Sequence, residues 1–166
     1  MAIKGLGEAA AESIVKEREK NGPYKDLFDF VQRVPMSAVK RSGMECLALS
    51  GAFDAFKEQI RREQFFAINA KGEVFLDTLT RYGNSYQQSM MEAQFSLFGA
   101  DMVEVSTPPI PAAESWGTLE RLNKERELVG IYLSGHPLDE YAVIVRDVCT
   151  MHAADLEDPS EFVDCD

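Results

Sequence analysis

The sequence has few cysteines and no long apolar run, and both absences narrow the class of protein. Its 166 residues include three cysteines, Cys46, Cys149 and Cys165, which are scattered and lack C-x-x-C spacing. An odd number of isolated cysteines makes neither a disulfide framework nor a structural zinc site, so we expect reduced thiols in a cytoplasmic protein. No run of about 18 apolar residues is present, so we expect no membrane span. The N-terminal residues show no signal-peptide pattern.

Histidine is also scarce. The sequence has two, His136 and His152, and neither has a nucleophile or carboxylate at a spacing typical of catalysis or metal binding. An enzymatic interpretation with His136 as general base would need such a partner. We therefore assign no catalytic and no metal-binding residue, and we expect His136 to cap or pack against a helix.

Positive charge is in deficit overall but not throughout the chain. The formal net charge is −11, whereas residues 1–72 hold 12 Lys and Arg against 10 Asp and Glu, and residues 73–166 hold 5 against 18. The first part is therefore mildly basic and the second strongly acidic. Strong nucleic-acid binding normally needs several neutralised phosphates, so any binding by the first part should be weak and salt-sensitive.

What the sequence does contain is a series of short amphipathic segments separated by glycine and proline. Apolar residues at helical spacing predict helices over 8–21, 27–34 and 37–49, with Ser37 as the N-cap of the third. Further helical pieces are predicted from residue 73 to 95, with a break at Gly83-Asn84, and over 119–133. Gly130 lies inside that last stretch and would allow close helix packing. The predicted fold class is mostly α.

The stretch Lys4-Gly5-Leu6-Gly7-Glu8 predicts a tight turn followed at once by a helix. Glycine adopts positive φ without a steric penalty, so Gly5 and Gly7 permit the turn. The first N–H groups of a helix have no partner within it, and the helix dipole places positive charge behind them. Such a turn can bind phosphate. The alternative is a plain tight turn before a packed helix, and short glycine motifs alone do not decide between them.

A second helix, turn and helix start is predicted over 47–54, around Ser50-Gly51. We interpret it as a degenerate second hairpin packed back to back with the first. A helical bundle without a ligand is nearly as good an explanation. The basic residues near this turn would in that case be solvated charges: Lys40, Arg41, Arg61 and Arg62.

Residues 99–115 contain Pro108, Pro109 and Pro111 and cannot continue a helix. We therefore divide the chain into a hairpin domain (1–98), an extended proline-rich linker (99–115), a smaller helical segment (116–150) and an acidic tail (151–166).

Two motifs resemble known binding elements. The first turn resembles the second half of a helix-hairpin-helix motif, which binds the DNA backbone without reading sequence; here Lys4 replaces the first apolar residue and Glu8 adds an acid. Gln94-Phe95-Ser96-Leu97-Phe98 resembles the bacterial sliding-clamp-binding peptide. Its glutamine amide would orient the peptide, and Leu97 and Phe98 would fill apolar pockets. The alternative is that the two phenylalanines close a helix against the core.

Five motifs in order resemble one family, the alpha subunit of bacterial DNA polymerase III, in the region after the fingers and before the OB-fold. They are Ile3 to Ala10, Gly22 to Phe30, Ser50 to Asp54, Gln94 to Phe98 and Tyr132 to Asp139. The resemblance implies a tandem helix-hairpin-helix bundle, a linker and a smaller helical segment. It also implies that the catalytic aspartates and Mg²⁺ of the parent polymerase lie elsewhere, so that this piece has no cofactor.

The resemblance further implies two partners, duplex primer–template DNA and the sliding clamp (beta subunit), with other holoenzyme subunits bound through the rest of the parent chain. The expected DNA-binding residues are Lys4, Gly5, Leu6, Gly7, Glu8 and Lys16, and the expected clamp-binding residues are Gln94, Phe95, Ser96, Leu97 and Phe98. The competing hypothesis is a structural connector between fingers and OB-fold that binds nothing itself.

Overall fold

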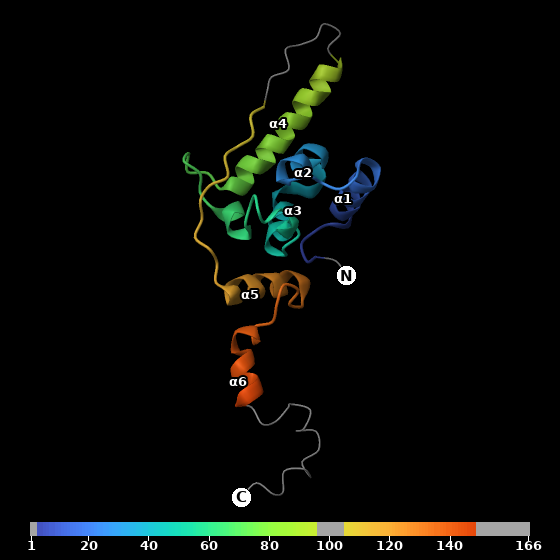
Figure 1. Ribbon diagram of the computed structural model, residues 1–166. Helices are drawn as coiled ribbons and strands as arrows, with labels where there is room; N and C mark the ends of the chain where they lie inside the picture. Colours follow the sequence, from blue (N-terminus) through green and yellow to red (C-terminus); the bar gives the residue numbers. More distant parts are fainter. Residues whose placement is uncertain (1–2, 96–104, 149–166) are drawn as a thin grey trace, which may run out of the picture. The chain divides into compact units, whose positions relative to one another are not determined.

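The computed structural model describes residues 3–95 and 105–148, and this part of the chain is mostly α-helical, as predicted (Figure 1). Its one β feature is an isolated bridge between Ile68 and Val74. The elements in order are α1 (Glu8–Asn21), α2 (Leu27–Arg33), α3 (Met36–Leu49), the 3₁₀ turns η1 (Asp54–Phe56) and η2 (Arg62–Phe66), α4 (Phe75–Phe95), α5 (Thr118–Val129), η3 (Asp139–Tyr141) and α6 (Ala142–Asp147). The chain divides into two compact units, Met1–Ser134 and Gly135–Asp166.

Local sequence signals explain the ends of the first three helices. Gly22, at φ 83°, ends α1, and Asp26 caps α2 by accepting a hydrogen bond from the N–H of Asp29 at 2.7 Å. The predicted cap of α3 was wrong, because the helix starts at Met36 and Ser37 lies in its first turn. Pro35 already fixes the backbone that leads into α3, and its carbonyl accepts the first helical N–H bonds.

The core of the first unit lies where α2 and α3 pack against α4. Three aromatic rings lie at its centre, with the centroids of Phe30 and Phe53 5.1 Å apart and those of Phe53 and Phe65 5.2 Å apart. Edge-on and offset-stacked contacts of this kind stabilise beyond simple burial. The core thus joins residues from α2, the second turn and η2.

Helix α4 is continuous, so the predicted break at Gly83-Asn84 was wrong. Gly83 is buried against α2, and a Cβ atom there would lie 2.7 Å from the carbonyl oxygen of Val31. The glycine therefore permits a close helix contact and does not end the helix. Beyond this contact, α4 extends past α2 and α3 (Figure 1).

Residues 105–117 form no helix and run along the surface of the first unit. Gln64 donates to the carbonyl of Pro111 at 2.9 Å, and Arg61 donates to the carbonyl of Ala113 at 3.1 Å. At the end of this segment, Trp116 stacks on Phe66 with centroids 5.6 Å apart. The segment is thereby held against η2 and leads into α5.

Helix α5 packs on α3 and ends at Gly130, which adopts φ 89°. The prediction that Gly130 permits close packing was wrong, since a Cβ there would meet nothing within 4 Å. It is instead the left-handed residue that ends the helix. After it, the chain turns back so that the N–H groups of Leu133 and Ser134 donate to Glu125.

In the second unit, residues 136–148 form η3 and α6. His136 Nδ1 accepts a hydrogen bond from the N–H of Leu138, and the N–H of His136 donates to Asp139. His136 therefore makes local turn contacts before η3, but it does not cap this helix, so a capping role is not confirmed.

A buried arginine joins the second turn to α5. Arg62 is 6% exposed and donates to both carboxylate oxygens of Asp54, at 2.8 and 2.5 Å. Its guanidinium also lies 3.5 Å from Glu125, which is 1% exposed. The prediction of Arg62 as a solvated charge was therefore wrong. Hydrogen bonding to Asp54 raises the pKa of Arg62 further above its usual range.

We predict that Arg62→Met lowers the free energy of unfolding by about 3–5 kcal/mol, because it leaves the buried Glu125 carboxylate without its cation. Glu125→Met should cost less, because Arg62 keeps Asp54 as a partner. The double variant should lose clearly less than the sum of the two. Urea denaturation of the four proteins measures this coupling. Additive losses would show that the two residues do not act as a pair.

Candidate nucleic-acid interface

The sequence predicts a tight turn that Gly5 and Gly7 permit through positive φ. In the structure, one of the two glycines adopts positive φ. Gly5 has φ 88°, whereas Gly7 has an extended backbone at φ −67° and ψ 148°. An ideal Cβ at Gly5 would lie 2.8 Å from Sγ of Cys46, while one at Gly7 would meet nothing within 4 Å. Only Gly5 is therefore required to be glycine.

Leu6 anchors the turn to the rest of the unit. Its side chain packs against the core, and its Cδ1 lies 3.2 Å from where a Cβ of Gly43 would be. Gly43 is buried in α3, so the small residue there leaves room for Leu6. The turn is thus held with Leu6 inward and Lys4, Gly5, Gly7 and Glu8 exposed.

The hydrogen bonds of the turn show which N–H groups remain available. The N–H of Lys4 donates to the carbonyl of Leu128 at 2.9 Å, and that of Leu6 donates to Ile3 at 3.1 Å. Over residues 3–95 and 105–148, no acceptor is found for the N–H groups of Gly5, Gly7, Glu8 and Ala9. Four donors therefore remain at the start of α1, where the helix dipole favours negative charge.

The second turn differs from the first. Gly51 adopts φ 81°, but its N–H donates to Ala48, that of Ala52 to Leu47 and that of Asp54 back to Gly51. The predicted start of an α-helix after this turn was wrong, because the short 3₁₀ turn η1 follows instead. The guanidinium of Arg62 fills the space beside Gly51, 2.1 Å from where a Cβ would be. The second turn is therefore a structural element in which the N–H groups of Gly51, Ala52 and Asp54 are used internally.

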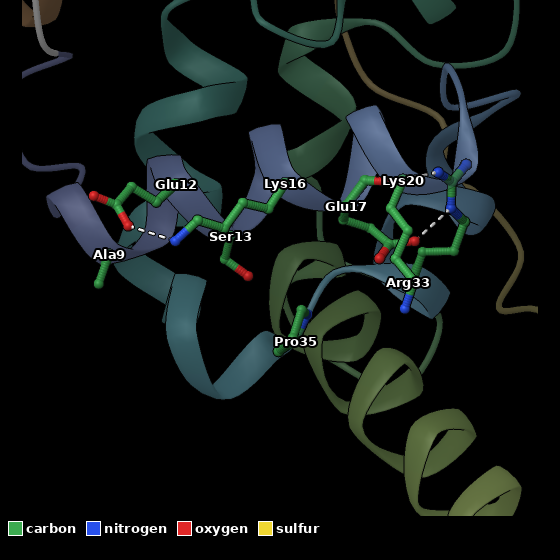
Figure 2. Close-up of a pocket in the computed structure, with 8 residues that line it drawn as sticks. All are labelled: Ala9, Glu12, Ser13, Lys16, Glu17, Lys20, Arg33 and Pro35. Carbon is green, nitrogen blue, oxygen red and sulfur yellow. Dashed lines mark hydrogen bonds and ion pairs between the residues drawn. The ribbon is translucent and has the colours of Figure 1, made fainter.

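The predicted residue Lys16 lies on α1 beside a groove of about 370 Å³ (Figure 2). The groove is lined by Ala9, Glu12, Ser13, Lys16, Glu17, Lys20, Arg33 and Pro35. Lys16 pairs with Glu12 at 2.9 Å, and their hydrogen bond and charges raise the pKa of Lys16 and lower that of Glu12. Both side chains are well exposed, so this pair is weak and Lys16 can exchange it for another anion.

Arg33, in contrast, is held in place. It pairs with Glu17 at 3.1 Å and with Asp29 at 2.9 Å, and it also donates to the carbonyl of Gly22 at 2.8 Å. Figure 2 shows its guanidinium turned toward Glu17. Arg33 therefore fixes the end of α1 against α2 and offers little free charge.

The sequence did not predict two residues that contact the first turn, Leu128 and Cys46. Leu128 contributes only its carbonyl, so no side-chain pattern could have indicated it. Cys46 lies beneath Gly5, and burial raises the pKa of its thiol, so it packs as a neutral group. The position of Cys46 on the inner face of α3 was the one available signal.

The predicted clamp-binding peptide lies mostly outside the described residues. The backbone of Gln94 and Phe95 forms the last turn of α4, and Ser96, Leu97 and Phe98 are not described. The structure thus places the start of this peptide at the end of the helix that extends past α2 and α3, and its role remains a prediction.

Over the described residues, no group of three or more His, Cys, Asp and Glu side chains is arranged to hold a metal ion. In the same ranges, no helix is both long and apolar enough to cross a membrane.

Comparison with known proteins adds two findings. The family described as "Helix-hairpin-helix motif" matches residues 1–64. Proteins named DNA polymerase III subunit alpha match nearly the whole chain: that of Treponema pallidum is 34% identical over 95% of this chain, that of Thermus aquaticus 35% over 98%, and that of Deinococcus radiodurans 38% over 94%. The chain spans only 11–13% of the length of these three relatives.

We predict that Gly5→Ala destabilises the protein by about 1–2 kcal/mol, because alanine is strained at positive φ and its Cβ would press on Cys46. Gly7→Ala, the matched control, should change stability by less than about 0.5 kcal/mol. Thermal and urea unfolding of both variants measures this. Equal stability of the two variants would contradict the described turn.

Proposed function

Because the chain belongs to the DNA polymerase III alpha family, of whose full-length members it spans about an eighth, we propose that its first turn binds the phosphate backbone of duplex DNA. The contact positions the duplex without reading its bases, since backbone N–H groups meet phosphate and not base edges. DNA synthesis itself belongs to the parent polymerase, and this segment contributes no catalytic residue to it.

The observation that supports this proposal is the set of four N–H groups, those of Gly5, Gly7, Glu8 and Ala9, which have no acceptor in the described part of the chain. They lie at the start of a 14-residue helix, and the exposed Lys4 is beside them. A phosphate would satisfy several of these donors and complement the helix dipole.

The same surface sets an upper limit on affinity. Glu8 and Glu12 lie close to the turn, and they repel phosphate. With few cations beside the turn, binding should be in the range of non-specific contacts, with a dissociation constant of about 10⁻⁴–10⁻⁶ M at physiological salt. Such weak DNA binding suits a segment that acts together with the rest of a longer polymerase.

We predict that the Lys4→Glu, Lys16→Glu double variant binds a labelled primer–template duplex at least about tenfold more weakly at low salt and with a flatter salt dependence. A matched control, Lys25→Glu with Lys71→Glu, makes the same change of net charge at exposed lysines away from the turn. Fluorescence anisotropy across a salt series measures both.

Equal losses in the two variants would mean that only net charge matters, and the turn would then not be the binding site. No binding by the unmodified chain even at low salt would favour the connector. The second turn supports that second candidate, because the N–H groups of Gly51, Ala52 and Asp54 are used within the unit and not offered to a ligand.

We further propose that Gln94 to Phe98 dock on the sliding clamp as a short peptide. Support comes from α4, whose last turns expose Met90 and Met91, the latter 61% exposed, on a helix that extends past its neighbours (Figure 1). A peptide at the end of such a helix can reach a groove on another protein. Leu97 and Phe98 would fill apolar pockets as the anchors.

We predict that Leu97→Ala with Phe98→Ala abolishes capture of this chain by immobilised sliding clamp, because two anchor side chains are lost. Met90→Ala with Met91→Ala, which removes apolar side chains just outside the peptide, should reduce capture far less. Capture that is unchanged by the first double variant would refute the clamp assignment.

A further inference from the structure

A second basic cleft lies on the first unit, away from the groove of Figure 2. It has a volume of about 220 Å³ and is lined by Asp54, Lys57, Ile60, Arg61, Arg62, Glu63, Ser115, Trp116 and Arg121. Four of these side chains are cationic and two are anionic, on a chain whose formal net charge is −11. The cleft is therefore a local concentration of positive charge on an acidic protein.

The two carboxylates of the cleft are already neutralised. Asp54 binds the guanidinium of Arg62 through both oxygens, and Glu63 pairs with Arg61 at 3.3 Å. The remaining two cations, Lys57 and Arg121, are exposed, and in the described ranges neither side chain has an ion-pair or hydrogen-bond partner. The buried Glu125 carboxylate also contacts Arg62, so one positive charge is in surplus at the cleft, and Lys57 and Arg121 are the cations that face it without such a partner in the described ranges.

The cleft is also preformed. Arg61 is fixed by its hydrogen bonds to the carbonyl of Ala113 and to the hydroxyl of Ser115, and Ile60 is 2% exposed. Trp116 is held by its stacking on Phe66 and by Lys124, whose Nζ lies 4.6 Å from the ring centroid. A ligand would therefore meet a fixed wall and two exposed cations.

Size and charge together define the ligand. Pockets for drug-sized molecules are about 300–1,000 Å³, so this cleft suits a smaller group. A single phosphate with part of its sugar fits both the volume and the surplus charge. Arg and Lys are the side chains that most often bind backbone phosphate.

Its position relative to the first turn favours a phosphate of DNA. Arg121 lies near the N-terminal end of α5, and Leu128 lies near the C-terminal end of this helix. The carbonyl of Leu128 accepts a hydrogen bond from the N–H of Lys4, in the glycine turn before α1. A helix rises about 1.5 Å per residue, so Arg121 and Leu128 are roughly 10 Å apart along α5. This distance is comparable to the length of about three base pairs along the duplex axis. One duplex can therefore reach both places.

We propose that Lys57 and Arg121 bind a second backbone phosphate of the duplex that the first turn holds, with α5 setting the spacing between the two contacts. This inference rests on the proposed duplex binding, and it assigns a contact that the helix-hairpin-helix turn does not supply. The second turn takes part only indirectly, because it places Asp54 and Arg62 in the wall of the cleft.

The test is duplex binding by the whole chain with Lys57→Ala and Arg121→Ala, across a salt series. Since both side chains are exposed and without partners, the variant should keep its melting temperature. We expect the affinity at low salt to fall about three- to tenfold, and the slope of log K against log salt to shrink by about 0.9, the value for one phosphate. Lys25→Ala with Lys71→Ala is the matched control and should change neither.

Trp116 is the chain's single tryptophan, so its fluorescence reports on the cleft directly. Duplex should change its emission in the unmodified chain and not in the Lys57→Ala, Arg121→Ala variant. The proposal would be overturned if dTTP changed the emission of Trp116 and the Lys57→Ala, Arg121→Ala variant still bound duplex normally. The cleft would then hold a free nucleotide and not a phosphate of the duplex.

The outcomes also separate this proposal from the first. Unchanged duplex binding by the Lys57→Ala, Arg121→Ala variant, with binding lost in Lys4→Glu, Lys16→Glu, would overturn the cleft and leave the first turn standing. The reverse pattern would support the cleft and refute the turn. An equal loss in the Lys25→Ala, Lys71→Ala control would overturn the cleft as a specific site.

Discussion

The buried guanidinium of Arg62 holds α5 and the second turn of the first unit together. It joins Asp54, after the second turn, to Glu125 on α5, and Glu125 in turn accepts from the N–H groups of Leu133 and Ser134. A charge this deeply buried is stable only with its partners in place, so α5 must dock where Glu125 meets Arg62. That docking brings the carbonyl of Leu128 to the N–H of Lys4 and supports the first turn.

This arrangement gives two similar glycine turns different roles. In the second, the N–H groups of Gly51, Ala52 and Asp54 have acceptors nearby, and Arg62 fills the space beside Gly51. In the first, the carbonyl of Leu128 accepts only from the N–H of Lys4, and four further donors near the start of α1 have no acceptor in the described part of the chain. One hairpin therefore braces the unit, while the other presents a surface suited to an anion. The second turn thus fits the connector hypothesis, and the first turn fits the DNA-binding hypothesis.

Helix positions followed well from local signals, because Gly22, Asp26 and Pro35 act on the backbone next to them. Long-range contacts could not be predicted from such local signals. Gly83 is typical of a helix break, yet it allows α4 to pack against the carbonyl of Val31, 52 residues earlier in the numbering. Arg62 has the sequence pattern of a solvated charge, and only the fold reveals Glu125 beside it. For the site, Gly5 was predictable from its turn, whereas the contribution of the Leu128 carbonyl was not.

We propose that duplex phosphate meets the first turn and not the second. Backbone amide chemical shifts test this most directly, in a ¹⁵N-labelled chain titrated with a primer–template duplex at low salt. We expect the amide signals of Gly5, Gly7, Glu8 and Ala9 to move progressively, while those of Gly51 and Ala52 stay in place. Shifts confined to Gly51 and Ala52, or no shift at either turn, would contradict it.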